Sequence, residues 1–181
     1  MLIRQACELD AEGIARVHVD AWRSTYRGIV PDDVLDGLSY EKRQERWNEI
    51  LRTAEQSRHH IWVAADLGRI VGFADGGRER EGDPQYTGEL YAIYILPEYQ
   101  RKGTGRGLLG QIAARLVEEG HEAALVWVLA DNPYRRFYER MGAVPVRTKE
   151  ITIGGTPLTE VAYGWPDLRQ LVRNIRQSWS G

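Results

Sequence analysis

A short segment rich in glycine and positive charge, residues 100–107, constrains the fold more than any other part of the chain. It reads Q-R-K-G-T-G-R-G and follows an apolar run over residues 89–96 that Pro97 stops. The apolar residues after it recur with the spacing of one helical face; they are Leu108, Leu109, Ile112, Ala113, Leu116 and Val117. We therefore expect a strand, a glycine turn and a helix in direct succession.

Such a turn has the physical properties of an anion site. Its backbone N–H groups converge on one point, and the N-terminus of the next helix adds partial positive charge. Glycines let a ligand approach the main chain closely, and Arg101, Lys102 and Arg106 supply full charges for phosphate oxygens. Glycines alone would fit a solvated turn equally well, but together with the cations they favour a pyrophosphate site.

The kind of phosphate ligand stays open at this level. Residues 105–110 match the dinucleotide pattern G-x-G-x-x-G, and Asp131 follows the next apolar run. A dinucleotide fold needs a tight turn from the strand into the glycines, whereas residues 97–102 intervene here. The order Lys-Gly-Thr excludes a nucleotide P-loop, which requires Gly-Lys-Ser/Thr. A nicotinamide-dependent oxidoreductase remains the less favoured alternative.

Hydrophobic periodicity predicts the other elements. Strands are expected over residues 2–6, 60–65, 70–74, 89–96, 123–129, 144–153 and 158–163. Residues 10–26 form an expected helix, and Pro31 opens a helical region that continues to residue 54. Residues 76–84 are expected to be a loop. Asn132-Pro133 is typical of an N-cap followed by proline at the first helical position.

A terminal amphipathic helix completes the expected elements. Its apolar positions are Leu168, Leu171, Val172, Ile175 and Trp179. We expect this helix to dock on the rest of the chain or on a partner subunit of a homodimer. No internal repeat or long linker interrupts the 181 residues, so one domain is the simplest organisation.

Composition excludes several classes of protein. Lys and Arg number 24 against 26 Asp and Glu, and this balance argues against nucleic-acid binding. The longest apolar stretches, 90–96 and 123–130, are too short to span a membrane, and no signal-peptide core is apparent. Cys7 is the single cysteine, so no intrachain disulfide forms. We therefore expect a cytoplasmic protein.

The four histidines predict no metal centre. His59 and His60 are adjacent, whereas His18 and His121 lie far from them in the sequence. This is not the spacing of metal ligands. No metal is expected.

The sequence resembles the GNAT superfamily of N-acetyltransferases. Members carry Q/R-x-x-G-x-G/A after their fourth strand, as residues 100–105 do, and an Asn-initiated helix with F-Y-E-x-x-G, similar to residues 132–142. The resemblance implies an α+β fold of three layers, with a mixed, mostly antiparallel sheet flanked by helices. That domain would cover residues 1–165, and residues 166–181 would form a helical extension.

The resemblance also implies an activity. The chain would move an acetyl group from acetyl-CoA to a primary amine of a small molecule or peptide by direct attack. A non-catalytic module that binds acyl-CoA and regulates a partner is the alternative. The positions that match the family's cofactor contacts are Ile93, Tyr94, Ile95, Gln100, Arg101, Lys102, Gly103, Thr104, Gly105, Arg106 and Asn132.

Two residues are implied to carry the chemistry. An alkyl ammonium has a pKa near ~10 and must lose a proton before it attacks; by resemblance, Glu89 is the candidate base. Asp75 and Glu79 are weaker candidates, and a Glu89 that merely faces water is the alternative. Tyr138 matches the family's general acid, although it also lies on an apolar stripe. Both roles are compatible, because a tyrosine can bury its ring and expose its hydroxyl.

The acceptor pocket is implied to lie at the first two helices and their connection. Trp22 and Tyr26 offer aromatic faces near Asp32 and Asp33, a combination that suits a cationic amine. Trp22 also lies on the core-facing stripe of its helix, and packing in the core is the favoured interpretation for it.

Overall fold

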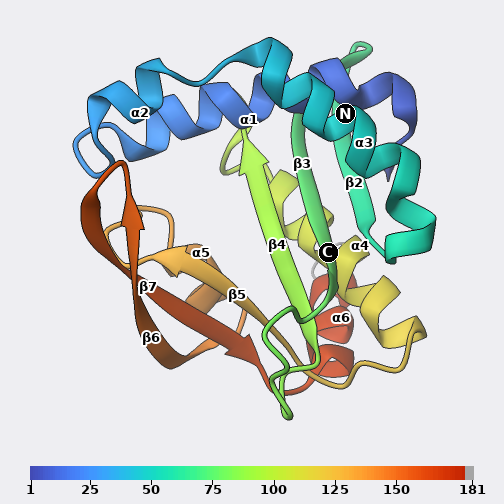
Figure 1. Cartoon of the computed structure of the whole chain (residues 1–181). Helices are drawn as coiled ribbons and strands as arrows, with labels where there is room; N and C mark the ends of the chain where they lie inside the picture. Colours follow the sequence, from blue (N-terminus) through green and yellow to red (C-terminus); the bar gives the residue numbers. More distant parts are fainter. Residues whose placement is uncertain (178–181) are drawn as a thin grey trace.

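The computed structural model describes residues 1–177, and within them seven strands form one sheet (Figure 1). Its order is β1-β2-β3-β4-β5-β7-β6, and every neighbouring pair is antiparallel except β4 and β5. The strands are β1 (Leu2–Gln5), β2 (His60–Asp66), β3 (Arg69–Arg78), β4 (Gly88–Ile95), β5 (Ala124–Leu129), β6 (Val144–Ile153) and β7 (Thr156–Trp165). The α+β class with a mixed, mostly antiparallel sheet is confirmed.

Helices cover both faces of this sheet. They are α1 (Ala11–Tyr26), α2 (Asp32–Asp36), α3 (Tyr40–Ser57), α4 (Thr104–Glu118), α5 (Arg136–Arg140) and α6 (Leu168–Gln177). In Figure 1, α3 crosses in front of the sheet, and α4 and α6 lie behind it. Side chains from α1, α4 and the central strands form the main buried core, with Phe73 and Leu108 fully inaccessible to solvent.

Before residue 90, two expected boundaries were wrong. The helical region expected from Pro31 onward is broken between α2 and α3, because Ser39 starts a new helix and its hydroxyl accepts the Lys42 N–H at 3.2 Å. Strand β3 also continues to Arg78, through part of the expected loop. Gly76 pairs with His60 and Leu90 in the sheet, and only glycine fits there, because a Cβ would lie 2.6 Å from Ile112 on α4.

The C-terminal helix α6 packs against α4 of the same chain. Leu168, Leu171 and Ile175 are buried on its inner face, as the amphipathic pattern predicted. Trp179, the last apolar position of that pattern, lies outside the described residues. None of the helices in residues 1–177 combines the length and the hydropathy that crossing a membrane requires.

The parallel pair β4 and β5 separates soon after it begins. Paired positions are Gly88 with Ala124, Glu89 with Leu125 and Leu90 with Val126. A register shift on the other side of β4 follows at once, with Leu90 opposite Gly76 and Ala92 opposite Asp75. Tyr91 is therefore an extra residue, a bulge that bends β4 away from β5. The sheet opens between the two strands beyond this point.

Candidate active site

A cavity of about 1130 Å³ lies where β4 and β5 diverge. Residues 91–95 of β4 form one wall and residues 126–128 of β5 form the other. The glycine loop, the end of α1 and the segment around α5 complete the lining. This volume is large enough for an extended organic ligand that passes between the strands.

The glycine loop is fixed to the end of β4 by side-chain hydrogen bonds. Gln100 Nε2 donates to the Ile95 carbonyl at 3.0 Å, and Thr104 Oγ1 donates to the Tyr99 carbonyl at 3.1 Å. Arg101 and Gly103 take positive φ values of 59° and 84°, a region that an arginine enters only at a cost in free energy. The loop is thereby held in one particular conformation at the mouth of the cavity.

The N-terminus of α4 lies at this cavity, with Gly103, Gly105 and Arg106 in its lining. The Gly107 N–H makes an intrahelical bond, to the Gly103 carbonyl at 2.9 Å. The amides of residues 103–106 precede it, and the first amides of an α-helix have no acceptor within the helix. They lie at the positive end of the helix dipole. The predicted anion site therefore faces a cavity.

Arg106 shows that this site suits a phosphate. It lines the cavity, and its Nε is buried without a hydrogen-bond partner among residues 1–177. An unsatisfied buried donor is costly, more so on a charged group. A phosphate oxygen would satisfy this atom and the neighbouring amides together, so the residues present fit the diphosphate of coenzyme A.

Most of the expected cofactor residues are brought to the cavity. Those that line it are Ile93, Tyr94, Ile95, Gln100, Arg101, Gly103, Gly105, Arg106 and Asn132. Lys102 and Thr104 are not part of the lining. The Lys102 ammonium lies 5.3 Å from the centre of the Tyr99 ring. Thr104 is only 1% exposed, and its hydroxyl donates to the Tyr99 carbonyl within the loop.

Tyr138 lies on α5 and lines the same cavity. Its ring packs near those of Tyr163 and Trp165, with centroids 6.1 and 6.2 Å away. Burial, with the nearby Tyr94 phenol as a lesser cause, raises the pKa of Tyr138 above its ordinary value. The hydroxyl is thus a neutral donor across the pH range in which proteins are stable, as a proton donor to a leaving group must be.

Asn132 connects the two sides of the cavity. Its Nδ2 donates to the Tyr26 hydroxyl at 3.1 Å, and its Oδ1 accepts the Tyr134 N–H at 2.8 Å. The second bond is that of an N-cap, as expected, but the helix does not start at Pro133. A turn closed by Arg135 N–H and the Asn132 carbonyl comes first, and α5 begins at Arg136.

The two expected acceptor residues differ in position. Tyr26 lines the cavity, and burial raises its pKa. Trp22 does not line it; the indole packs edge-on against Tyr26, 4.9 Å between centroids. Packing in the core was the favoured interpretation for Trp22, and this position agrees with it. Asp32 pairs with Arg27 at 3.0 Å on the exposed surface.

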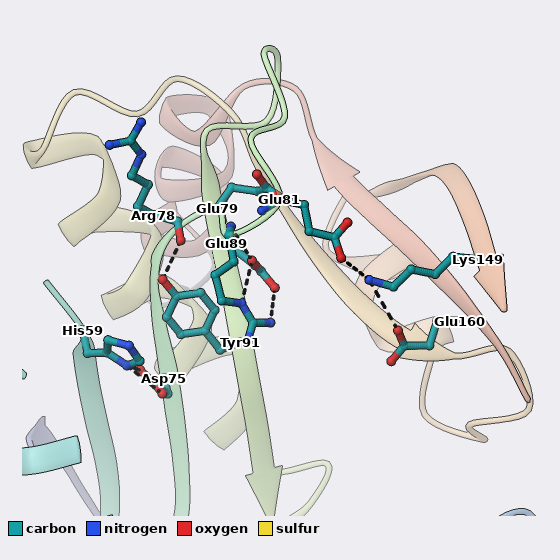
Figure 2. Close-up of polar contacts among 10 residues, drawn as sticks. His59, Asp75, Arg78, Glu79, Glu81, Glu89, Tyr91, Lys149 and Glu160 are labelled. Atoms are coloured by element: carbon teal, nitrogen blue, oxygen red, sulfur yellow. Dashed lines mark hydrogen bonds and ion pairs between the residues drawn. The ribbon is translucent and has the colours of Figure 1, made fainter. Parts of the chain in front are cut away.

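Glu89 is buried rather than facing water, with 1% of its surface exposed. Arg80, just after β3, binds both carboxylate oxygens: Nη2 lies 2.5 Å from Oε1 and Nε 3.1 Å from Oε2. The carboxylate is not part of the cavity wall. Figure 2 shows it beside Tyr91 on β4. Tyr91 does line the cavity, and the Arg80 guanidinium lies 4.6 Å from the centre of its ring.

Neither weaker candidate base reaches the cavity wall. Asp75 is 5% exposed and lies 3.1 Å from His59 Nδ1; burial raises its pKa despite that partner. Glu79 accepts the backbone N–H groups of Glu81 and Asp83 at 2.9 and 2.7 Å. It therefore shapes the loop that follows β3.

Sequence reasoning missed several residues of the wall, Trp127 and Tyr91 above all. Trp127 lies in the apolar run that predicted β5, and nothing in that run indicates which side chains face a cavity. The indole is covered by two cations, Lys149 at 4.0 Å and Arg147 at 5.4 Å from the ring centroid. Tyr91 is exposed to the cavity by the bulge, a feature that the local sequence does not encode.

The dinucleotide alternative does not survive the structure. Residues 105–110 lie inside α4, which begins at Thr104, and so do not form a turn between strand and helix. Gly105 instead allows close packing, because a Cβ at this position would lie 3.2 Å from Ile95. Among residues 1–177, no three His, Cys, Asp or Glu side chains cluster as metal ligands would.

Comparison with known proteins points to one family. The model of the acetyltransferase (GNAT) family matches residues 18–143. An uncharacterised N-acetyltransferase of Bacillus subtilis is 41% identical over 170 residues, which span 93% of this chain and 95% of the relative. The relative is thus similar along almost its whole length.

Solved structures show the same fold. The PaiA N-acetyltransferase of Thermoplasma acidophilum, solved with coenzyme A, has a TM-score of 0.70 at 23% identity, covering 88% of this chain and 96% of its own. YncA of Salmonella typhimurium, solved with acetyl-CoA, has a TM-score of 0.70 at 20% identity, covering 93% and 94%.

The divergent strand pair, the cationic glycine turn beside it and these similarities define an acetyl-CoA-dependent acyltransferase. The chain belongs to the acetyltransferase (GNAT) family.

Proposed function

We propose that this enzyme acetylates a primary amine of a small molecule or peptide, and that the amine attacks the acetyl group directly. The observation that carries the proposal is the cavity between β4 and β5. Two cations at the proposed diphosphate site, Arg101 and Arg106, line the same cavity as the phenols of Tyr138 and Tyr26. We further propose that residues 1–165 are the catalytic domain and that residues 166–181 are its helical extension. We also propose that the enzyme acts in the cytoplasm.

Acetyl-CoA, when bound, supplies the thioester whose carbonyl carbon the amine attacks. As the new C–N bond forms and the C–S bond breaks, the Tyr138 hydroxyl would donate its proton to the leaving sulfur. The nitrogen, which carries two protons when it attacks and one in the amide, would return the second proton to the Tyr138 phenolate, directly or through solvent. Main-chain N–H groups of Ile93–Ile95, on the open side of β4, are suited to stabilise charge on the carbonyl oxygen.

The proton lost by the attacking ammonium needs an acceptor. We propose Glu89, because it is a carboxylate on the strand that forms the cavity wall and lies two residues before Tyr91. Its present partner, Arg80, has a side chain that is 60% exposed and can move. Glu89 therefore receives the proton either through a water molecule or after the guanidinium shifts.

Removing the cation at the diphosphate site is expected to weaken cofactor binding. Arg106→Gln should raise the Kd for acetyl-CoA about 10–100-fold, the loss expected for a charge-assisted hydrogen bond. Titration calorimetry measures this directly. Arg115→Gln is the control, because Arg115 lies on the same helix but is exposed and pairs with Glu118. Equal affinities for wild type and Arg106→Gln would contradict the assignment of the site.

Free-thiol release across a panel of amines tests the activity itself. Wild type is expected to release thiol with at least one amine, and Glu89→Gln should lower kcat about 10²-fold because the proton acceptor is gone. The amide is nearly isosteric with the carboxylate and keeps most of the packing. A Glu89→Gln enzyme with undiminished kcat at every pH would remove Glu89 from the mechanism.

One observation favours the regulatory alternative. The Glu89 carboxylate is closed off by Arg80 and lies outside the cavity wall, an arrangement that a non-catalytic acyl-CoA-binding module would tolerate. One measurement distinguishes the enzyme from the regulatory module. Tight acetyl-CoA binding without thiol release for any amine, across primary amines of metabolites and peptide N-termini, would support the module and reject the enzyme.

A further inference from the structure

The contact between Arg80 and Glu89 is unusually complete. Besides the two guanidinium contacts, the backbone N–H of Arg80 donates to Glu89 Oε2 at 3.2 Å. The guanidinium and the main chain of one residue thus hold both oxygens of a carboxylate that is 1% exposed. This geometry fixes the position of the carboxylate as well as its charge.

Besides Arg80, most of the titratable groups around Glu89 are acidic or neutral. The titratable groups around it are Tyr91 on β4, Asp75 on β3, Glu79 in the next loop, and Glu160 on β7 with its partner Lys149 on β6. Figure 2 shows Glu160 and Lys149 across from Glu89, on the neighbouring hairpin. A buried carboxylate among other acids takes up a proton unless a cation compensates it. Arg80 is the cation in direct contact.

We infer that Arg80 is a positioning residue of the acetyl transfer, which orients the Glu89 carboxylate and balances its charge so that it can accept the proton of the acceptor ammonium. The inference rests on the proposed function. In this step an N–H bond of the ammonium breaks and an O–H bond forms on Glu89. Arg80 remains protonated throughout, and the neutral amine then attacks.

The position of the guanidinium links this pair to the cavity. Arg80 lies over the ring of Tyr91, which is part of the cavity wall. The guanidinium thus contacts Glu89 on one side and a cavity residue on the other. A water molecule in the cavity could therefore carry the proton to Glu89 while Arg80 stays in contact with it.

The pH dependence of Arg80→Gln and Arg80→Lys tests the inference. The pH profile of kcat/KM is measured with saturating acetyl-CoA. Loss of the cation should move its acid limb to higher pH, because a carboxylate without a neighbouring cation holds a proton more readily and only the carboxylate form accepts one. Arg80→Lys keeps the charge but loses the bidentate guanidinium. Its acid limb should therefore lie between those of wild type and Arg80→Gln.

Arg4→Gln is a matched control. Arg4 binds both oxygens of the buried Asp10 at 2.7 Å, and a backbone N–H, that of Cys7, completes the set. Neither residue lines the cavity. This variant should lose stability as Arg80→Gln does, yet keep the wild-type acid limb. If Arg80 had only a structural role, Arg80→Gln would likewise keep the wild-type acid limb.

The outcomes separate the inference from the function on which it rests. An active wild type whose acid limb is unchanged in Arg80→Gln overturns the role of Arg80 alone. A wild type that binds acetyl-CoA but acetylates no amine overturns the proposed function, and the inference with it. An upward shift of the acid limb in Arg80→Gln but not in Arg4→Gln, with unchanged acetyl-CoA affinity, supports both.

Discussion

Tyr138→Phe is expected to lower kcat roughly 10²–10⁴-fold, the usual contribution of a positioned general acid. The substitution removes one oxygen and keeps the ring among Phe137, Tyr163 and Trp165. The fold and the acetyl-CoA affinity should therefore be preserved. Because the pKa of Tyr138 is raised, its hydroxyl stays protonated through the alkaline range, and the wild-type enzyme should show no alkaline loss of activity that depends on this residue.

Steady-state kinetics with saturating acetyl-CoA measures the effect, and Tyr163→Phe provides the control. Tyr163 is equally buried, but its hydroxyl donates to Glu139 at 3.2 Å and is not part of the cavity wall. Its kcat should stay near that of wild type. If both variants lose activity equally, the loss reports packing around α5 and not proton donation.

The second large effect concerns Gly105, where a side chain has no room. A Cβ at this position would lie 3.2 Å from Ile95 Cδ1 and 3.4 Å from the Phe137 ring, and all three residues line the cavity. Gly105→Val is expected to raise the Kd for acetyl-CoA about 10²–10³-fold, an effect of roughly 3–4 kcal/mol, because the added methyl groups occupy the space of the ligand at the helix N-terminus.

Gly105→Ala and a melting experiment control for folding. The alanine Cβ is in tight contact but Ile95 can give way, so a smaller loss of affinity should accompany near-normal stability. Alanine is also the better helix former, which opposes any loss of stability. Full acetyl-CoA affinity in Gly105→Val would place the cofactor elsewhere and contradict the proposed site.

The elements that could be predicted are those whose signal is local. Hydrophobic periodicity predicted α1 and α4, because their buried residues recur every three or four positions. Gly154-Gly155 between two apolar runs predicted the hairpin of β6 and β7. The start of α4, where the anion site is proposed, could be located for the same reason, since the backbone donors of a helix N-terminus follow from where the helix begins.

The parts that could not be predicted depend on how distant strands meet. The sequence around Glu89 does not reveal that Arg80 folds back onto it across the turn between β3 and β4. The pattern of β5 does not distinguish Trp127, which faces the cavity, from its buried neighbour Leu125. Trp22 has a similar ambiguity, because a helical stripe can face a core or a pocket with the same spacing.

The brief pairing of β4 with β5 has a mechanical consequence. Only three residue pairs, Gly88–Ala124 through Leu90–Val126, form the seam between the two halves of the sheet. A ligand bound in the opening contacts both β4 and β5, and it replaces some of the cross-strand hydrogen bonds that the divergence removes. Deuterium uptake in β5 and β7 should therefore slow when acetyl-CoA binds, even at amides that the ligand never touches.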